Sequence, residues 1–288
     1  MSADDFALAE FLQFPRVSVV VPAKNEARNL AHVFATIPSW VDEIVFVDGR
    51  STDDSVAVVR DICPAAKIIV QEGWGKGEAL RLGFAACTGD IIVMMDADGS
   101  TDGGEIARFV GALVTGADFV KGSRFASGGG SDDITFERSL GNFILSRLVN
   151  VLFGTQYTDL CYGYNAMWAR HLPQLNLDCD GFEVETVLNV RAAKAGLVVH
   201  EVPSHEHQRL HGASNLRVMR DGWRIAKVIM REWASGRRRS ATAVTAPDAS
   251  GSAVASGPAV PTAPDESVVP SPAGEALASA QTADSAAQ

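Results

Sequence analysis

Two aspartates, Asp96 and Asp98, stand two residues apart at the end of the apolar run 91–95. A short apolar run that ends in carboxylates and a glycine is typical of a buried strand that reaches the edge of a sheet. In extended backbone, residues two apart point to the same side. Two carboxylates on one side can hold Mg²⁺ or Mn²⁺, while substrate phosphate fills other coordination positions. The alternative is that the aspartates only cap a turn before a helix that starts at Thr101 or Asp102, because this pattern is common.

The rest of the chain predicts the elements that position these carboxylates. Apolar runs bounded by turn residues predict strands at 17–21, 44–47, 67–70, 91–95, 118–121 and 197–202. Apolar spacing and N-cap residues predict helices at 5–13, 27–37, 54–62, 80–85, 104–114, 139–153, 182–195 and 215–233. Strands that alternate with helices through right-handed crossovers form a mostly parallel sheet with helices on both faces. The predicted fold class is therefore α/β, and both apolar helices of the second half are expected to pack on the sheet.

Further polar clusters adjoin the predicted strands. Residues 24–26 follow the first strand, Asp48 follows the second, and the glycine-rich segment 75–77 lies between the third and the fourth. In open α/β sheets, ligands bind at the carboxyl ends of the strands. We therefore expect these clusters to meet Asp96 and Asp98 at one edge of the sheet.

The last part of the chain has a composition of its own. From Ser240 onward it is mostly Ala, Ser, Pro, Thr, Gly and Val without Lys or Arg, and such a segment buries too little apolar surface to offset its ordering entropy. We predict an N-terminal extension over residues 1–15, one domain over 16–234 and a disordered tail over 235–288. Five acidic residues of the tail carry half of the formal charge of −10, and an acidic chain gives no indication of a nucleic-acid partner.

Cysteine usage and hydropathy indicate the cellular compartment in which the protein is expected. The four cysteines are scattered without a Cys-x-x-Cys pair, which is typical of a reduced protein. The N-terminus lacks a signal-peptide pattern, and no apolar run reaches the roughly 20 residues that a membrane-spanning helix needs. We expect a cytoplasmic protein, free or peripheral on the inner face of the membrane.

Three segments occur together in the order typical of one protein family. They are Val-Val-Val-Pro-Ala-Lys-Asn-Glu at 19–26, Val-Asp-Gly-Arg-Ser-Thr-Asp-Asp-Ser at 47–55 and Met-Asp-Ala-Asp at 95–98. Over about residues 16–232, the chain resembles the family 2 inverting glycosyltransferases, which have the nucleotide-diphospho-sugar transferase (GT-A) fold. Later segments are similar to those of the dolichyl-phosphate mannosyltransferase and polyprenyl-phosphate glycosyltransferase group: Gly-Ser-Arg-Phe at 122–125, Arg138, and the Arg209 to Leu216 motif.

The resemblance implies a role for each matching position. The residues implied near the nucleotide are Pro22, Ala23, Asn25, Glu26, Asp48, Lys76 and Gly77. Those implied at the metal and the diphosphate are Asp96, Asp98 and Ser100. Arg124 and Arg138 would meet an acceptor phosphate, and Arg209 would meet the donor diphosphate. One departure concerns base and sugar preference: relatives often read Val-Asp-Asp-Gly-Ser, whereas here Gly49-Arg50 replaces Asp-Gly.

The implied reaction is inverting, metal-dependent transfer of a hexose from a GDP-mannose or UDP-glucose type of donor. A divalent ion and arginine stabilise the charge that grows on the departing diphosphate. The implied acceptor is a polyprenyl phosphate, reached from the membrane surface or through a separate membrane-protein partner. Such a phosphate is already ionised, whereas a soluble or polysaccharide hydroxyl acceptor needs a carboxylate base. Glu183, Glu185 and Asp159 are the candidate bases, and each also fits a solvated helix or loop charge.

Two other functions stay open. A sugar-1-phosphate nucleotidyltransferase normally has a glycine-rich, arginine-containing loop after its first strand, but residues 22–26 occupy that place here. A non-catalytic nucleotide-sugar-binding protein would bind the nucleotide without transferring sugar, and the intact Asp96 and Asp98 argue against it.

A histidine cluster and a glycine cluster have two interpretations each. His200, His205, His207 and His211 lie near two glutamates, but no Cys or His pair elsewhere has structural-zinc spacing. We therefore favour polar residues around an acceptor cleft over a zinc site. The glycines at 128–130 lack the Gly-Lys-Ser/Thr ending of a phosphate-binding P-loop, so they predict a mobile acceptor loop.

Overall fold

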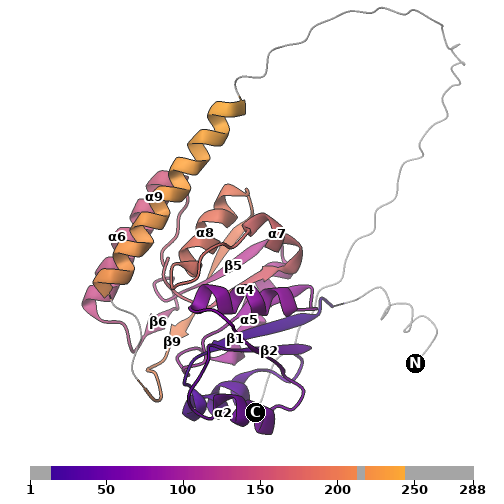
Figure 1. Ribbon diagram of the computed structural model, residues 1–288. Coiled ribbons are helices and arrows are strands. Elements are labelled where there is room, and N and C mark those ends of the chain that lie inside the picture. Colours follow the sequence, from indigo (N-terminus) through magenta and orange to yellow (C-terminus); the bar gives the residue numbers. More distant parts are fainter. Residues whose placement is uncertain (1–13, 213–217, 244–288) are drawn as a thin grey trace, which may run out of the picture. The chain divides into compact units, whose positions relative to one another are not determined.

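The computed structural model describes residues 14–212 and 218–243 (Figure 1). The strands are β1 (Val17–Ala23), β2 (Glu43–Asp48), β3 (Lys67–Val70), β4 (Ile91–Met94), β5 (Phe119–Ser123), β6 (Gly130–Ser131), β7 (Asn165–Trp168), β8 (Val199–Pro203) and β9 (His205–Glu206). The helices are α2 (Ala27–Thr36), α3 (Ser55–Ile62), α4 (Lys76–Ala86), α5 (Ile106–Val114), α6 (Phe136–Phe153), α7 (Leu172–Leu175), α8 (Val184–Lys194) and α9 (Val218–Ala243), with 3₁₀ turns η1 (Gly103–Glu105) and η2 (Ala169–His171). The predicted helix 5–13 and the predicted tail beyond residue 243 lie outside the described residues.

Seven strands form one sheet in the order β3-β2-β1-β4-β7-β5-β8. Neighbouring strands are parallel except at β7, which runs antiparallel between β4 and β5. The prediction of a mostly parallel α/β sheet is confirmed. β1 lies between β2 and β4, and all three strands run parallel. The loops that follow them therefore lie at the same edge of the sheet.

Helices cover both faces of the sheet, which explains why its central strands are apolar on both sides. Val19 of β1 and Val93 of β4 pack with residues of α2, α3 and α5 in one core. Val20 and Met94, one position further along each strand, pack with residues of α4, α7 and α8 in a second core. Alternate side chains of each strand thus anchor it between two layers of helices.

α6 and α9 build a third core together with α8. Val149 of α6 and Ile229 of α9 are fully buried beside Val190 of α8, and the two long helices lie side by side (Figure 1). The sequence predicted that both helices pack on the sheet. The structure differs because α8 already covers that face. α6 and α9 cover α8, and α9 also adds Val228 to the second core.

Some boundaries did not follow from the sequence. β7 was not predicted, since Asn165–Trp168 contains no β-branched residue and no run of turn residues marks its ends. α9 continues to Ala243, past residue 235, where the tail was predicted to begin. None of the described helices combines the length and the apolar character that crossing a membrane requires.

Candidate active site

A pocket of about 610 Å³ lies where β1, β2 and β4 reach their carboxyl ends. Its volume is typical of a site for a small organic ligand. Many of the residues singled out in the sequence line it together: Pro22, Ala23, Asn25, Glu26, Lys76, Asp96, Asp98 and Arg209. The polar clusters of three separate loops and of the segment after β9 thus face one space.

The loops after β1 and β2 hold each other in place. Asn25 adopts a left-handed conformation (φ 59°), which asparagine tolerates better than most residues, and its Oδ1 accepts a hydrogen bond from the Thr52 backbone N–H at 2.7 Å. The Ser51 N–H donates to Asp48 Oδ2 at 3.1 Å. Asp48 is buried beside the pocket-lining Gly49, and its Oδ1 has no hydrogen-bond partner among the described residues. Asp48 does not itself line the pocket, and a buried acceptor without a donor is costly, so this oxygen can accept a hydrogen bond from a ligand that reaches past Gly49.

Lys76 joins two carboxylates beside the pocket. Its Nζ lies 2.5 Å from Asp96 Oδ1 and 2.7 Å from Glu185 Oε1. The chain enters α4 through Gly75, whose φ of 98° favours glycine. A Cβ on Gly77 would collide with a backbone carbonyl of the segment before α8, so this glycine allows the close approach that brings Glu185 to Lys76. Neither Gly77 nor Glu185 lines the pocket, and Glu185 acts on it through Lys76.

Arg209 joins Asp98 to Glu26 across the pocket. Its Nη2 donates to Asp98 Oδ2 at 2.6 Å, and its Nη1 donates to Glu26 Oε1 at 2.9 Å. The other oxygen of Asp98 accepts hydrogen bonds from the backbone N–H and the hydroxyl of Ser100, at 3.0 and 2.7 Å. Ser100 does not line the pocket, so in this arrangement it orients the Asp98 carboxylate.

Ion pairs beside the pocket join four carboxylates to Lys76 and Arg209, and Lys24, Arg220 and Arg224 add positive charge to the lining. The acidic members are Glu26, Asp96, Asp98 and Glu185, and the basic members are Lys76 and Arg209. Burial raises the pKa of Glu26 and of Glu185, and a neighbouring aspartate raises each pKa further, although the paired cation acts in the opposite direction. Asp96 and Asp98, which both line the pocket, offer carboxylate oxygens of the kind that Mg²⁺ or Mn²⁺ prefers, so these residues fit such an ion.

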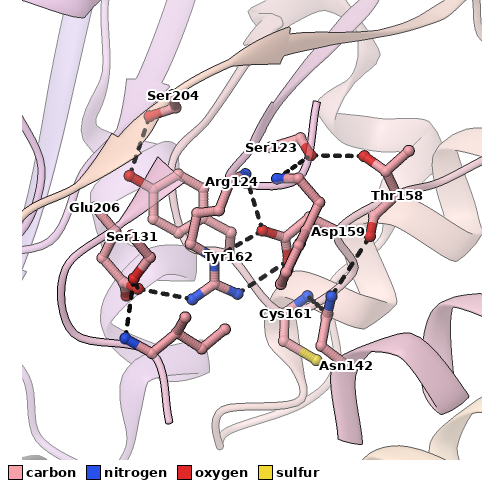
Figure 2. A network of polar contacts seen from close by, with 12 residues as sticks. Ser123, Arg124, Ser131, Asn142, Thr158, Asp159, Cys161, Tyr162, Ser204 and Glu206 are labelled. Atoms are coloured by element: carbon pink, nitrogen blue, oxygen red, sulfur yellow. Dashed lines mark hydrogen bonds and ion pairs between the residues drawn. The ribbon is translucent and has the colours of Figure 1, made fainter. Parts of the chain in front are cut away.

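Arg124 lies outside this pocket, in a buried network (Figure 2). Its Nε and Nη2 donate to the two oxygens of Asp159 at 2.7 and 3.0 Å, and its Nη1 donates to Glu206 at 3.0 Å. The Asp159 side chain is 0% exposed. Burial acts to raise the pKa of Asp159, but the charge and hydrogen bonds of Arg124 outweigh it and lower that pKa. The family resemblance implied that Arg124 meets an acceptor phosphate, but all three of its guanidinium nitrogens are engaged by carboxylates.

Arg138 belongs to the same network and also lies away from the pocket. Its Nη1 donates to Asp133 Oδ2 at 3.0 Å, and its Nη2 lies 3.8 Å from Glu206. Glu206 therefore joins Arg138 to Arg124, which lie together as the resemblance implied. The structure separates this pair of arginines from the pocket that holds Arg209.

Sequence reasoning missed several residues that line the pocket. They are Gln71, Ala79, Ala97, Gly181, Phe182, Gly212, Arg220 and Arg224, in addition to Gly49. Lys24 and Gly75 also line the pocket, and they belong to the clusters at 24–26 and 75–77 that the sequence predicted there. The spacing of Arg220 and Arg224 placed them only on the polar side of a predicted helix. No pattern within that helix indicates which loop its polar side meets.

The position that departs from the family pattern contacts an exposed aromatic ring. The guanidinium carbon of Arg50 lies 4.2 Å from the centre of the Trp74 ring, and Lys24 Nζ lies 4.9 Å from it. A cation near an aromatic face is attracted by the negative face of the ring. Since Lys24 also lines the pocket, the Gly49-Arg50 substitution changes the surface beside it.

The buried cysteines are poor candidates for nucleophilic chemistry. Burial raises the pKa of Cys87, Cys161 and Cys179 to about 12, so these thiols stay protonated near neutral pH. All four cysteines of the chain are free of disulfides.

Comparison with known sequences and structures gives consistent matches. The profile of the family described as Glycosyl transferase family 2 matches residues 18–172. Glycosyltransferase AglJ of Haloferax volcanii is 31% identical over 212 residues, which are 72% of this chain and 68% of AglJ. The undecaprenyl-phosphate 4-deoxy-4-formamido-L-arabinose transferase of Enterobacter sp. is 28% identical over 219 residues, which are 71% of this chain and 64% of that transferase. This chain therefore spans less than two thirds of the latter protein.

A solved structure extends the likeness to three dimensions. The crystal structure of glucosyl-3-phosphoglycerate synthase from Mycobacterium tuberculosis, in complex with Mn²⁺, UDP-glucose and phosphoglyceric acid, is similar with a TM-score of 0.61 and 25% identity. The match covers 81% of this chain and 84% of that one.

Proposed function

The chain belongs to glycosyl transferase family 2, is a glycosyltransferase and has the GT-A fold, and from that premise we propose the reaction that it catalyses. It transfers a hexose with inversion from a nucleotide-diphosphate sugar of the GDP-mannose or UDP-glucose type to a polyprenyl phosphate. The observation that carries the proposal is the convergence of Asp96, Asp98 and Arg209 on one pocket at the carboxyl edge of the sheet.

The donor's diphosphate lies beside these groups in the proposed complex. Asp96 and Asp98 would hold a divalent cation, which supplies positive charge against the negative charge that grows on the departing diphosphate. Arg209 presents a planar set of donors that suits phosphate oxygens. Asp48 Oδ1, buried without a partner among the described residues, accepts a hydrogen bond from the base of the nucleotide.

Bond changes in the transfer step balance without an added reagent. An oxygen of the acceptor phosphate attacks the anomeric carbon from the face opposite the diphosphate, and the bond from that carbon to the diphosphate oxygen breaks. The electron pair leaves with the nucleoside diphosphate. The configuration at the anomeric carbon is inverted because attack and departure occur on opposite faces.

The positions of the three candidate bases favour an acceptor whose attack requires no base. Asp159 is held by Arg124, Glu185 is held by Lys76, and Glu183 lies 3.5 Å from Arg224. None of these three carboxylates lines the pocket. An acceptor phosphate is already ionised at neutral pH, so its attack requires no carboxylate to take a proton.

An exposed apolar and basic surface on α6 and α9 supports a lipid acceptor. Large apolar side chains stand exposed on both helices: Phe136, Phe143, Ile144 and Val151 on α6, and Met219 and Trp223 on α9. Arg220 and Arg224 of α9 line the pocket, and Lys227 Nζ lies 5.5 Å from the Trp223 ring centre. A helix face that combines apolar and basic residues suits the interface of an anionic membrane. The protein would then work at the membrane surface, where the lipid phosphate lies.

A soluble phosphate compound is the second candidate acceptor. The similarity to glucosyl-3-phosphoglycerate synthase favours it, because that enzyme was solved with phosphoglyceric acid beside UDP-glucose. Attack there would come from a hydroxyl group, so a carboxylate would have to take its proton.

Direct assay with defined acceptors separates these candidates. The full chain is incubated with UDP- and GDP-sugars, with Mn²⁺ or Mg²⁺, and with either a polyprenyl phosphate in detergent or phosphoglyceric acid. Chromatography then follows the sugar. Sugar in the lipid fraction is the expected result, and sugar on phosphoglyceric acid alone would assign the soluble acceptor. Nucleotide bound with no sugar moved to any acceptor would contradict transfer.

A further inference from the structure

Asp132, His205 and His207, whose side chains are of types that bind metal ions, meet outside the pocket at the short two-stranded sheet of β6 and β9. His205 Nε2 lies 3.0 Å from Asp132 Oδ2, and His207 Nδ1 lies 3.7 Å from the same oxygen. One ligand atom from each residue lies within 4.8 Å of the others. The centres of the two imidazole rings are 4.9 Å apart.

Backbone pairing fixes these residues next to one another. β6 pairs in parallel with β9, with Gly130 opposite His205, and the Asp132 N–H donates to the Glu206 carbonyl at 2.8 Å. His205 and His207 stand two apart, which brings both to the same side of an extended chain. A Cβ on Gly130 would lie 2.7 Å from His205 Nδ1, so the glycine gives this imidazole its place.

We propose that Asp132, His205 and His207 bind one divalent transition-metal ion, with Zn²⁺ as the best match, at a site separate from Asp96 and Asp98. Bonds of about 2.0–2.1 Å to nitrogen and oxygen place tetrahedral ligand atoms about 3.3 Å apart. The two imidazole nitrogens lie 3.0 and 3.7 Å from the Asp132 oxygen, on either side of that value. Two imidazoles with one carboxylate suit zinc, whereas carboxylates alone suit Mg²⁺ or Mn²⁺.

This metal site would connect the segment that carries Asp133, the partner of Arg138, with the segment that leads to Arg209 in the pocket. The ion would fasten the segment after β6, which carries the Asp133 partner of Arg138, to the segment after β9. The His207 N–H donates to the Ser100 carbonyl at 2.8 Å, two residues before Arg209 meets Asp98. A bound ion would therefore hold Arg209 and the segment that follows the glycines at 128–130 in a fixed relation. The alternative is that the two histidines only pair with Asp132 at the protein surface and bind no metal.

Metal titration of the full chain distinguishes the two roles. Co²⁺ serves as an optical probe for tetrahedral coordination, and equilibrium dialysis against Zn²⁺ gives stoichiometry and affinity. The variants are His207→Ala and Asp132→Asn, with His32→Ala as the matched control because His32 is an exposed histidine on α2, outside this cluster. Asp98→Ala reports on binding at the pocket.

The expected result is one tight Zn²⁺ equivalent in the wild type, His32→Ala and Asp98→Ala. Loss of a ligand in His207→Ala or Asp132→Asn should weaken it at least about 10-fold, since even changes in outer-shell partners cost about 10–100-fold. Equal binding by all variants, or binding lost only in Asp98→Ala, would overturn the site. Circular dichroism confirms that each variant is folded. Sugar transfer can fail without touching this result, because the titration uses no donor.

Discussion

The pocket at the sheet edge and the Arg124 network are both built from ion pairs, but they neutralise charge differently. At the pocket, Glu26, Asp96 and Asp98 of the lining and Glu185 behind it share Lys76 and Arg209, and Asp96 and Asp98 are partly exposed. In the network, every nitrogen of Arg124 meets a carboxylate, and Asp159 is fully buried.

This difference separates binding from support. A buried pair whose hydrogen bonds are complete has nothing left to offer a ligand, and breaking it leaves a charge in a medium of low polarity. A partly exposed pocket lined by charged side chains can gain stabilising contacts from a ligand. We therefore infer that the pocket binds the donor, and that the Arg124 network holds together the three segments that carry Arg124, Asp159 and Glu206.

The largest expected effect is on stability. Asp159→Ala leaves the buried Arg124 guanidinium with Glu206 but without the carboxylate that binds its Nε and Nη2, and should lower the free energy of unfolding by about 3–5 kcal/mol in urea denaturation. The double variant Arg124→Met with Asp159→Leu should recover most of that loss, because Glu206 keeps Ser131 and Arg138 as partners. A single variant as stable as the wild type would remove the distinction between the two regions.

The next effect is on transfer. Asp98→Ala should lower the transfer rate about 10²–10³-fold, a loss typical of removing one group that stabilises transition-state charge. Its free energy of unfolding should change far less than that of Asp159→Ala, because Asp98 and Arg209 are partly exposed to water whereas Arg124 and Asp159 are buried. Transfer assays and urea unfolding on the same preparation check both statements, and equal destabilisation by the two changes would make the pocket a structural site.

A smaller loss is expected from Arg209→Lys. Lysine keeps the charge but cannot reach Asp98 and Glu26 in the fixed geometry of a guanidinium. Hydrogen bonds to charged groups contribute about 1.5–3 kcal/mol, so transfer should fall about 10–100-fold. Steady-state kinetics with varied donor should show this loss, and Arg138→Lys serves as the matched control outside the pocket. The same loss in both variants would argue against a special place for Arg209.

The smallest effect is on pH dependence. Arg124 lowers the pKa of Asp159 below its ordinary value of 3.8, although burial acts to raise it. A carboxyl group whose folded pKa is lowered stabilises the fold above its unfolded pKa and loses that contribution as pH falls through the folded pKa. Unfolding free energy should therefore decline below about pH 4, and more steeply in the wild type than in the Arg124→Met, Asp159→Leu variant. Parallel curves would place the titration elsewhere.

The sequence predicted those parts of the site that depend on local pattern. The apolar run before Asp96 gave β4, and the alternation of strands and helices placed the loops after β1, β2 and β4 at one edge. The position of β4 and the two-residue spacing of Asp96 and Asp98 both depend on residues that are adjacent in the sequence, so a single sequence is enough to predict them.

Contacts between distant segments did not follow from local pattern. Arg124 reaches Asp159 and Glu206 from another part of the chain, and nothing near it in sequence indicates that these carboxylates engage all of its nitrogens. Arg209 meets Asp98 across 111 positions, which only the family resemblance implied. Phe182 lies in the pocket and Asp132 lies beside His205 and His207 because loops pack together there. The spacing of residues in a single sequence does not predict such packing.

Calorimetric titration of the full chain with UDP and with GDP, in the presence and absence of Mn²⁺, tests the central claim most directly. If the edge carboxylates hold a cation for the donor's diphosphate, Mn²⁺ should tighten binding of one nucleotide at least about 10-fold in the wild type and leave Asp98→Ala unchanged; about 1.4 kcal/mol corresponds to that factor. Nucleotide affinity that does not respond to Mn²⁺ in the wild type, or that responds equally in Asp98→Ala, would contradict it.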